Sequence, residues 1–196
     1  KPLVSDGTPV KKGDIILRIK ASYRTLLCGE RLSLNILQRM SGIATATARY
    51  MKELSGTHTQ LLDTRKTAPG LRLLDKMAVH QGGGTNHRMG LYDMIMLKDN
   101  HIKVAGGIPN AVKQVRANLP LSVKLEVETT NLEEVQQAID CEVDLIMLDN
   151  MSNEMMAKAV KMIAGRAKTE ASGNMSIPRL KEVAATGVDY ISVGAL

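Results

Sequence analysis

Charged and small polar residues follow the apolar segments in the second half of this chain at regular intervals. The residues at these positions are Arg65, Lys98, Glu128, Asp149, Ser172 and Gly194, spaced 21 to 33 residues apart. Each interval is close to the length of one strand-and-helix unit. Packing alone does not explain buried strands that end in charged residues, because stability alone would favour ordinary turn residues there. We therefore expect these residues to gather in one site at one end of the fold.

The cations in this set point to an anionic ligand. Arg65 and Lys66 directly follow one apolar segment, Lys98 follows the next, and the glycine-rich stretch 82–90 between them carries His87 and Arg88. A charge cluster on a helix is usually a solvated face, but these cations stand at strand ends and in a glycine loop. Arginine binds carboxylates through two parallel hydrogen bonds, and lysine acts as a point charge.

Two acidic residues and two groups of small residues complete the candidate site. Glu128 and Asp149 follow neighbouring apolar segments, and paired carboxylates can stabilise a developing cation, hold Mg²⁺ or bind ribose hydroxyls. Alone, each carboxylate would more often cap a helix or form an ion pair. The stretches 172–174 (Ser-Gly-Asn) and 192–194 (Ser-Val-Gly) would let backbone N–H groups approach a phosphate, although such triplets are also ordinary turns.

Alternating apolar strands and amphipathic helices predict the architecture that positions these residues. We expect strands at 60–64, 94–97, 123–127, 145–148, 169–171 and 190–193, and helices at 109–118, 131–139, 152–164 and 176–185. Asn131 and Ser152 are expected N-caps, and Glu134 gives Asn131 a pattern like a capping box. This alternation predicts a parallel sheet covered by helices, an α/β barrel whose chemistry lies at the carboxyl ends of the strands.

The first part of the chain has a different pattern. Residues 1–27 have turns at Asp6-Gly7 and Lys12-Gly13, and the alternation in 15–20 predicts a half-buried strand. Apolar residues then recur at helical spacing from Cys28 to about Leu54, with Gly42 as a possible interruption. These patterns predict a short β region at 1–27, a connecting helical segment at 28–57 and a barrel domain at 58–196.

Composition excludes several classes of protein. The apolar content is 44%, and no apolar run approaches the length of a membrane-spanning helix. The two cysteines, Cys28 and Cys141, lack metal-type spacing, and no signal peptide is visible, so we expect a reduced, cytoplasmic protein. The net charge of +6 could indicate nucleic-acid binding. However, the basic residues are dispersed and aromatic residues are scarce, so a small anionic substrate is the preferred interpretation.

Several motifs resemble those of the quinolinate phosphoribosyltransferases. They are Glu30-Arg31 with Ser41-Gly42-Ile43-Ala44-Thr45; 63–72 (DTRKTAPGLR); 82–93, which begins GGGTNHRMGL; Lys98-Asp99-Asn100-His101; Leu148-Asp149-Asn150; and Glu170-Ala171-Ser172-Gly173. The resemblance covers the whole chain, and the second and third motifs are highly specific. Asn174 is a departure, because many family members have glycine there.

The resemblance implies a fold, a reaction and a set of site residues. The fold would be an incomplete TIM-like α/β barrel preceded by the tail of an α/β sandwich domain. The reaction would be phosphoribosyl transfer from 5-phosphoribosyl 1-diphosphate to quinolinate with decarboxylation, in a homodimer or larger homo-oligomer with shared active sites. The resemblance assigns catalysis to Lys66, Lys98, Glu128 and Asp149, and Mg²⁺ binding to Glu128 and Asp149. It assigns substrate binding to these four and to Arg31, Thr64, Arg65, His87, Arg88, Ser172, Gly173, Asn174 and Gly194.

Three alternatives remain at this point. A related phosphoribosyltransferase would act on nicotinate or another small acid, and would release no CO₂. A non-catalytic barrel would bind an anion without turnover. A nucleic-acid-binding protein would bind random DNA with a steep dependence on salt concentration.

Overall fold

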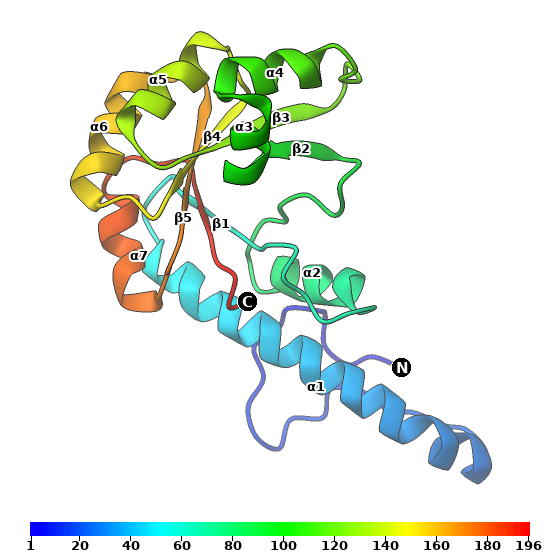
Figure 1. The fold of residues 1–196 in the computed structure, drawn as a ribbon. Coiled ribbons are helices and arrows are strands. Elements are labelled where there is room, and N and C mark those ends of the chain that lie inside the picture. Colours follow the sequence, from blue (N-terminus) through cyan, green and yellow to red (C-terminus); the bar gives the residue numbers. More distant parts are fainter.

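The computed structural model describes all residues from Lys1 to Leu196. It contains seven helices and six strands, which alternate through most of the chain (Figure 1). The helices are α1 (Tyr23–Glu53), α2 (Arg72–Gln81), α3 (Asp99–Ala105), α4 (Ile108–Arg116), α5 (Leu132–Asp140), α6 (Asn153–Ile163) and α7 (Ile177–Ala184). The strands are β1 (Gln60–Leu62), β2 (Met94–Leu97), β3 (Lys124–Thr129), β4 (Leu145–Asp149), β5 (Lys168–Ser172) and β6 (Tyr190–Ser192).

All six strands pair in parallel in one sheet, in the order β1-β6-β5-β4-β3-β2. The sheet is open, because the edge strands β1 and β2 do not pair with each other. Strand residues such as Val127, Ile146, Leu148 and Ile191 are completely buried, as expected where both faces of a parallel sheet are covered. The α/β class and the six expected strands are thus confirmed, with ends that differ by no more than two residues.

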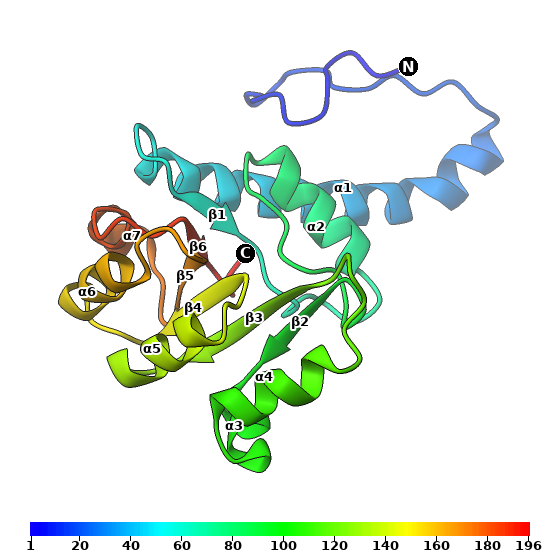
Figure 2. The ribbon, with the colours of Figure 1, turned by 90° about the horizontal axis from the view of Figure 1, so that it is seen from above.

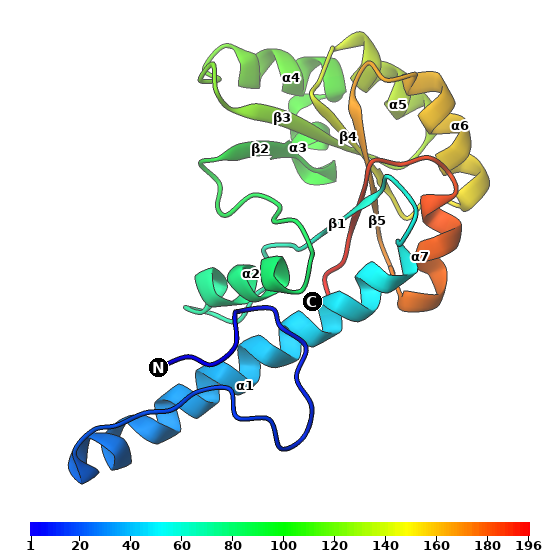
Figure 3. The same cartoon turned by 180° about the vertical axis from the view of Figure 1, so that it is seen from behind.

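Helices α4 to α7 cover the outer side of this curved sheet (Figure 3). Their buried apolar residues, among them Val112, Val135, Met156 and Leu180, join the strand residues in one core. The expected caps form at Asn131 and Ser152, whose side chains accept from the N–H groups of Glu134 and Met155. The capping-box prediction is shifted by one residue, because the Glu134 carboxylate accepts from the N–H of Thr130 at 2.7 Å and not from that of Asn131.

The first 22 residues differ from the sequence prediction. The turns at Gly7 and Gly13 are present, but the strand expected at 15–20 is absent, and the only ladder contact there is an isolated bridge between Pro2 and Leu17. No sheet face covers the apolar side chains of this segment, so Ile15 and Ile19 are 59% and 62% exposed. Figure 2 shows residues 1–22 on the side of α1 that faces away from the sheet.

Helix α1 is longer and straighter than expected. It begins at Tyr23, where the Ser22 side chain caps it, and it continues without a break through Gly42. Its second half packs against α2 and α7, and its first half extends beyond the rest of the chain (Figure 1). The helices α2 and α3 have no counterpart in the sequence prediction. No helix combines the length and the apolar character needed to span a membrane.

Candidate active site

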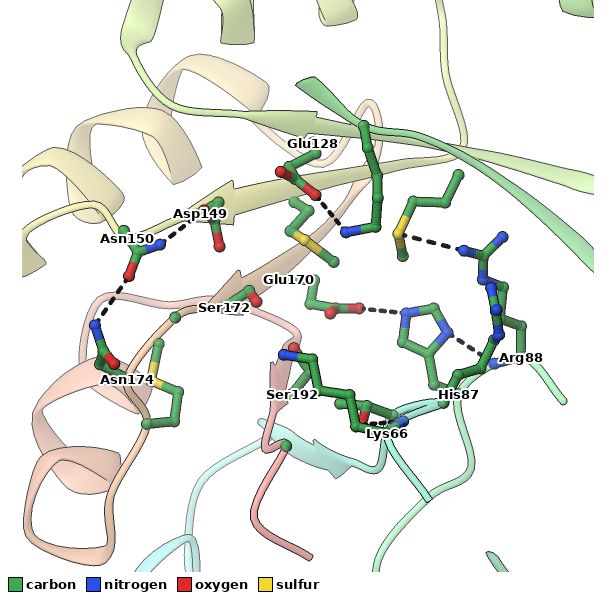
Figure 4. A pocket seen from close by; sticks show the side chains of 18 residues that line it. Lys66, His87, Arg88, Glu128, Asp149, Asn150, Glu170, Ser172, Asn174 and Ser192 are labelled. Carbon is green, nitrogen blue, oxygen red and sulfur yellow. Dashed lines mark hydrogen bonds and ion pairs between the residues drawn. The ribbon is translucent and has the colours of Figure 1, made fainter. Parts of the chain in front are cut away.

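A cavity of about 630 Å³ lies at the carboxyl ends of the strands (Figure 4). Apart from Arg31, every residue that the sequence analysis assigned to the site lines this cavity: Thr64, Arg65, Lys66, His87, Arg88, Lys98, Glu128, Asp149, Ser172, Gly173, Asn174 and Gly194. Arg31 is exposed on α1 and does not line it. The lining also includes Ser192, the first residue of the predicted stretch 192–194, and residues that the sequence analysis did not assign: Met96, Met147, Asn150, Glu170 and Met175.

The register of the sheet arranges the polar residues along the rim. Glu128 on β3 pairs with Met147 on β4, and Asp149, two residues further along β4, pairs with Ser172 on β5. The two carboxylates therefore leave neighbouring strands on the same side, because residues at even spacing in a strand share a face. Lys98 follows β2 and its Nζ donates to Glu128 Oε2 at 2.8 Å. One wall of the cavity thus carries a lysine and two carboxylates on successive strands.

Two guanidinium groups in the cavity have no carboxylate partner. Arg88 donates to the carbonyl oxygen of Met94 at 3.0 Å and to the sulfur of Met96 at 3.7 Å, and it forms no ion pair. Burial and the nearby charge of Arg65 lower the pKa of Arg88. Arg65 itself is only partly exposed, and its Nε is buried without a hydrogen-bond partner. Two neighbouring guanidinium groups that form no ion pair offer a site for an anion.

Lys66 lies in the loop after β1, beside Gly194 near the end of the chain. A Cβ atom on Gly194 would be 3.3 Å from Lys66 Cδ and 3.5 Å from its Nζ, so glycine leaves space for this side chain. The backbone N–H of Lys66 donates to the Thr64 hydroxyl at 3.0 Å, which fixes the turn after β1.

A buried ion pair behind the cavity fixes the loop that carries His87. Lys76 on α2 is 1% exposed and pairs with Asp63, which directly follows β1. Asp63 also accepts from the backbone N–H of His87 at 2.8 Å, and Lys76 donates to the carbonyl oxygen of His87 at 3.0 Å. Burial raises the pKa of Asp63 despite this pair. Sequence analysis missed this support because it did not predict α2.

A third arginine, Arg72, joins the two cation-bearing loops without lining the cavity. Its guanidinium donates to the Thr67 hydroxyl at 3.2 Å, to the carbonyl oxygen of Arg65 at 3.3 Å and to that of Met89 at 3.2 Å. Nearby, Asp75 accepts from the backbone N–H of Ala68 and forms two 2.7 Å hydrogen bonds with Arg39 of α1. Helix α2 therefore connects α1 to the loop after β1.

Two buried glutamates that sequence analysis did not identify lie beneath His87, and one of them, Glu170, lines the cavity. Glu126 and Glu170 lie in the middle of β3 and β5, and both are completely buried. The Nε2 atom of His87 is 3.3 Å from a Glu126 oxygen and 3.1 Å from a Glu170 oxygen. No hydrogen bond of good geometry reaches any of the four carboxylate oxygens. An acidic residue in the middle of a strand, flanked by residues that are buried, was the signal that could have revealed this cluster.

His87 is directed toward these glutamates. Burial lowers the pKa of the imidazole, but Glu126 and Glu170 outweigh this effect and raise it to about 10. The backbone N–H of Arg88 donates to Nδ1 at 2.7 Å, which favours the neutral ring. In both protonation states, Nε2 carries a proton that faces the carboxylates. Burial and the charge of Glu170 also raise the pKa of Glu126 to about 7.

We expect the His87→Leu variant to lose about 3 kcal/mol of unfolding free energy, because two buried carboxylates would then face each other without a donor. Urea denaturation at pH 7 measures this loss. Adding Glu126→Gln to His87→Leu removes one of the two carboxylates, and we expect it to restore at least half of the lost stability. An unchanged denaturation midpoint in His87→Leu would contradict the assignment of this cluster.

Comparison with known proteins agrees with this arrangement. Residues 43–196 match the family model described as "Quinolinate phosphoribosyl transferase, C-terminal domain", and residues 1–41 match the corresponding N-terminal domain. The two matches meet inside α1. A "Probable nicotinate-nucleotide pyrophosphorylase [carboxylating]" of Synechocystis is 47% identical over 98% of this chain, and a Bacillus subtilis protein with the same description is 44% identical over 97% of it.

Solved structures have the same fold. The nicotinate-nucleotide pyrophosphorylase of Francisella tularensis superimposes with a TM-score of 0.94 at 46% identity, covering all of this chain and 69% of that one. NadC of Streptococcus pyogenes also gives 0.94, at 44% identity, covering 98% of this chain and 68% of that one. The present chain spans 66% of the length of the Synechocystis and Bacillus relatives and 56% of a rice relative. With both family models matched, the chain belongs to the quinolinate phosphoribosyltransferase family.

Proposed function

We propose that this chain transfers the phosphoribosyl group of 5-phosphoribosyl 1-diphosphate to quinolinate and releases CO₂. The products are nicotinate mononucleotide and pyrophosphate, so the reaction is a step of de novo NAD biosynthesis. The observation that carries the proposal is the division of the cavity. Two guanidinium groups that form no ion pair, those of Arg65 and Arg88, line the cavity, and Figure 4 shows Arg88 on one side of it and Glu128 and Asp149 on another.

The cationic side suits quinolinate, a dianion. Arg65 and Arg88 would bind its carboxylates through their guanidinium groups, and Lys66 and Lys98 would add charge. Thr64 lies beside this group and contributes a hydroxyl. The imidazole of His87 is engaged with the glutamates, so direct contact of His87 with quinolinate would require its ring to turn.

The acidic side suits the ribosyl group. The ring nitrogen of quinolinate would donate its electron pair to the anomeric carbon while the bond from that carbon to pyrophosphate breaks. Glu128 and Asp149 would stabilise the positive charge that develops on the ribose. The small residues at 172–174 and Gly194 would hold the 5′-phosphate. The C2 carboxylate would then leave as CO₂, its bonding electrons stabilised by the cationic nitrogen, and a proton would take its place.

The residues present also suit Mg²⁺. Glu128 and Asp149 offer carboxylate oxygens at the ends of neighbouring strands, and Mg²⁺ is commonly held by one or two carboxylates together with substrate phosphates and water. When bound with the diphosphate, the ion would neutralise the charge of the leaving group. Lys98 competes for the same Glu128 oxygen at 2.8 Å, so this lysine would move or share the carboxylate on metal binding.

Two further parts of the proposal concern the setting of the enzyme. We propose a homodimer with shared active sites, because Arg31 is exposed on α1 and lies outside the cavity of its own chain. We also propose a cytoplasmic, reducing location, because Cys28 and Cys141 are both free.

One assay tests the activity. The protein is incubated with quinolinate, 5-phosphoribosyl 1-diphosphate and Mg²⁺, and nicotinate mononucleotide and CO₂ are measured. We expect both products in equal amounts. Turnover of nicotinate in place of quinolinate, without CO₂, would indicate a different phosphoribosyltransferase. Binding of both substrates without any product would indicate an anion-binding protein.

We expect Glu128→Gln and Asp149→Asn each to lower kcat by about 100-fold with little change in quinolinate affinity, because a developing cation is stabilised only in the transition state. Single-turnover kinetics and quinolinate titration separate the two effects. The assignment is wrong if quinolinate affinity collapses in these variants while bound substrate reacts at the normal rate.

A further inference from the structure

The side chain of Asn150 joins two loops of the cavity that are far apart in sequence. Its Nδ2 donates to Asp149 Oδ2 at 2.8 Å, and its Oδ1 accepts from Asn174 Nδ2 at 3.3 Å (Figure 4). The backbone N–H of Asn150 donates to the carbonyl oxygen of Ser172 at 3.0 Å. A continuous chain of hydrogen bonds therefore runs from the loop after β5, through one amide, to the carboxylate at the end of β4.

The backbone around Asn150 is shaped for this amide. Asn150 has a φ of 51°, in the left-handed region that asparagine tolerates better than most residues. A Cβ atom on Gly173 would be 2.2 Å from Asn150 Oδ1, so the amide occupies the space that a side chain at 173 would need. Arg179 on α7 fixes both flanks, because it donates to the carbonyl oxygens of Gly173 and Met151 at 3.1 Å each.

This arrangement restrains Asp149 specifically. One carboxylate oxygen accepts from Asn150, which fixes the rotation of the group and leaves the other oxygen for a ligand in the cavity. An anion bound at 172–174 would restrict the side chain of Asn174. Because Asn174 is hydrogen-bonded to Asn150, and Asn150 to Asp149, the orientation of the Asp149 carboxylate would be restricted as well. A bare carboxylate at a strand end, without this donor, would rotate freely.

We propose that Asn150 is a positioning residue that couples the occupancy of the loop 172–174 to the orientation of the Asp149 carboxylate. This inference rests on the proposed function, in which the loop holds the 5′-phosphate and Asp149 faces the ribose. Binding of the 5′-phosphate to the loop 172–174 thereby orients the Asp149 carboxylate, which stabilises the reacting carbon of the ribose.

The test is a double-mutant cycle with Asn150→Gly and Asp149→Asn. Glycine keeps the positive φ and removes only the amide, so it separates the side chain from the backbone. We expect Asn150→Gly to lower kcat about tenfold, since a hydrogen bond to a charged group is lost, with the KM for quinolinate nearly unchanged. In the Asp149→Asn background, the same change should have almost no further effect. Asn150→Asp, which replaces the donor by a second carboxylate, should lower kcat at least as much.

Each outcome is decisive. Effects that add fully in the double variant would show that Asn150 acts independently of Asp149, and would overturn the proposal. A wild-type protein without turnover would refute the proposed function, but titration of the same four proteins with 5-phosphoribosyl 1-diphosphate would still test Asn150. In this titration, we expect Asn150→Gly to weaken the binding of 5-phosphoribosyl 1-diphosphate only in the background that retains Asp149. Equal weakening in both backgrounds, or none in either, would overturn the coupling.

Discussion

Replacing Arg65 or Lys98 by alanine should reduce kcat/KM for quinolinate by two to three orders of magnitude. Each change removes a cation that would face a substrate carboxylate in a partly buried cavity. Truncating one partner of such a pair typically costs about 2–5 kcal/mol, much of it because the other charge is left without compensation. Steady-state kinetics with varied quinolinate, at saturating 5-phosphoribosyl 1-diphosphate, measures the loss.

The two variants should differ in a second way. Lys98 forms an ion pair with Glu128, whereas Arg65 has no carboxylate partner. Lys98→Ala should therefore also change the apparent Mg²⁺ requirement, because it frees the Glu128 carboxylate, and Arg65→Ala should not. Lys103→Ala, which removes an exposed charge from α3, is the matched control and should retain wild-type kinetics. Near-native quinolinate turnover in Arg65→Ala or Lys98→Ala would refute the role of these cations.

The strand pattern was predictable because strands such as β2 and β4 combine an apolar run with a polar residue at or just after its end. Strands β3, β4 and β5 are buried on both faces, so runs such as Leu145–Leu148 are apolar without alternation. The location of the site was also predictable, because parallel strands bring all their carboxyl ends to one edge of the sheet. Counting residues from strand end to strand end gave six of the twelve assigned residues that line the cavity, and the loop motifs with the family resemblance gave the other six.

The errors have equally specific causes. The alternation at 15–20 predicts a strand, but a strand needs a neighbour, and Leu17 finds only an isolated bridge. Helix α2 was missed because its buried face carries Asp75 and Lys76, which hide the helical periodicity of its apolar residues. These charges are buried because each has a partner from another part of the chain, Arg39 and Asp63. Pairs between residues from different segments of the chain cannot be recognised from the local sequence pattern of one helix.

The buried parts of the site were missed for the same reason. Glu126 and Glu170 are two residues before Glu128 and Ser172, so they share a strand face with a rim residue but lie one layer deeper. Sequence analysis identified the rim because polarity at a strand end is a local signal. The contact of both glutamates with His87 joins three separate segments, and only the fold brings these segments together.

The position of Arg31 leads to a prediction about assembly. Arg31 is exposed on α1 and is absent from the cavity lining. It belongs to the first half of this helix, which extends beyond the barrel strands (Figure 1). The same half of the helix exposes apolar side chains, with Leu32 at 66% and Leu37 at 40%. A second copy of the chain could cover this surface. The alternative is that Arg31 is a solvated charge on the exposed face of α1.

Complementation between two inactive variants distinguishes these cases. Arg31→Ala and Lys98→Ala subunits are each expected to be nearly inactive alone. In a two-fold dimer with sites shared in trans, the mixed dimer has one barrel with Lys98 that receives an intact Arg31 from its partner. Random exchange of equal amounts should then restore about a quarter of wild-type activity, since half of the dimers are mixed and each has one complete site. A mixture that remains inactive after subunit exchange has been demonstrated would show that Arg31 does not act across the interface. Full activity of Arg31→Ala alone would show that it does not act in catalysis at all, because a cation needed to compensate a substrate carboxylate cannot be removed without loss.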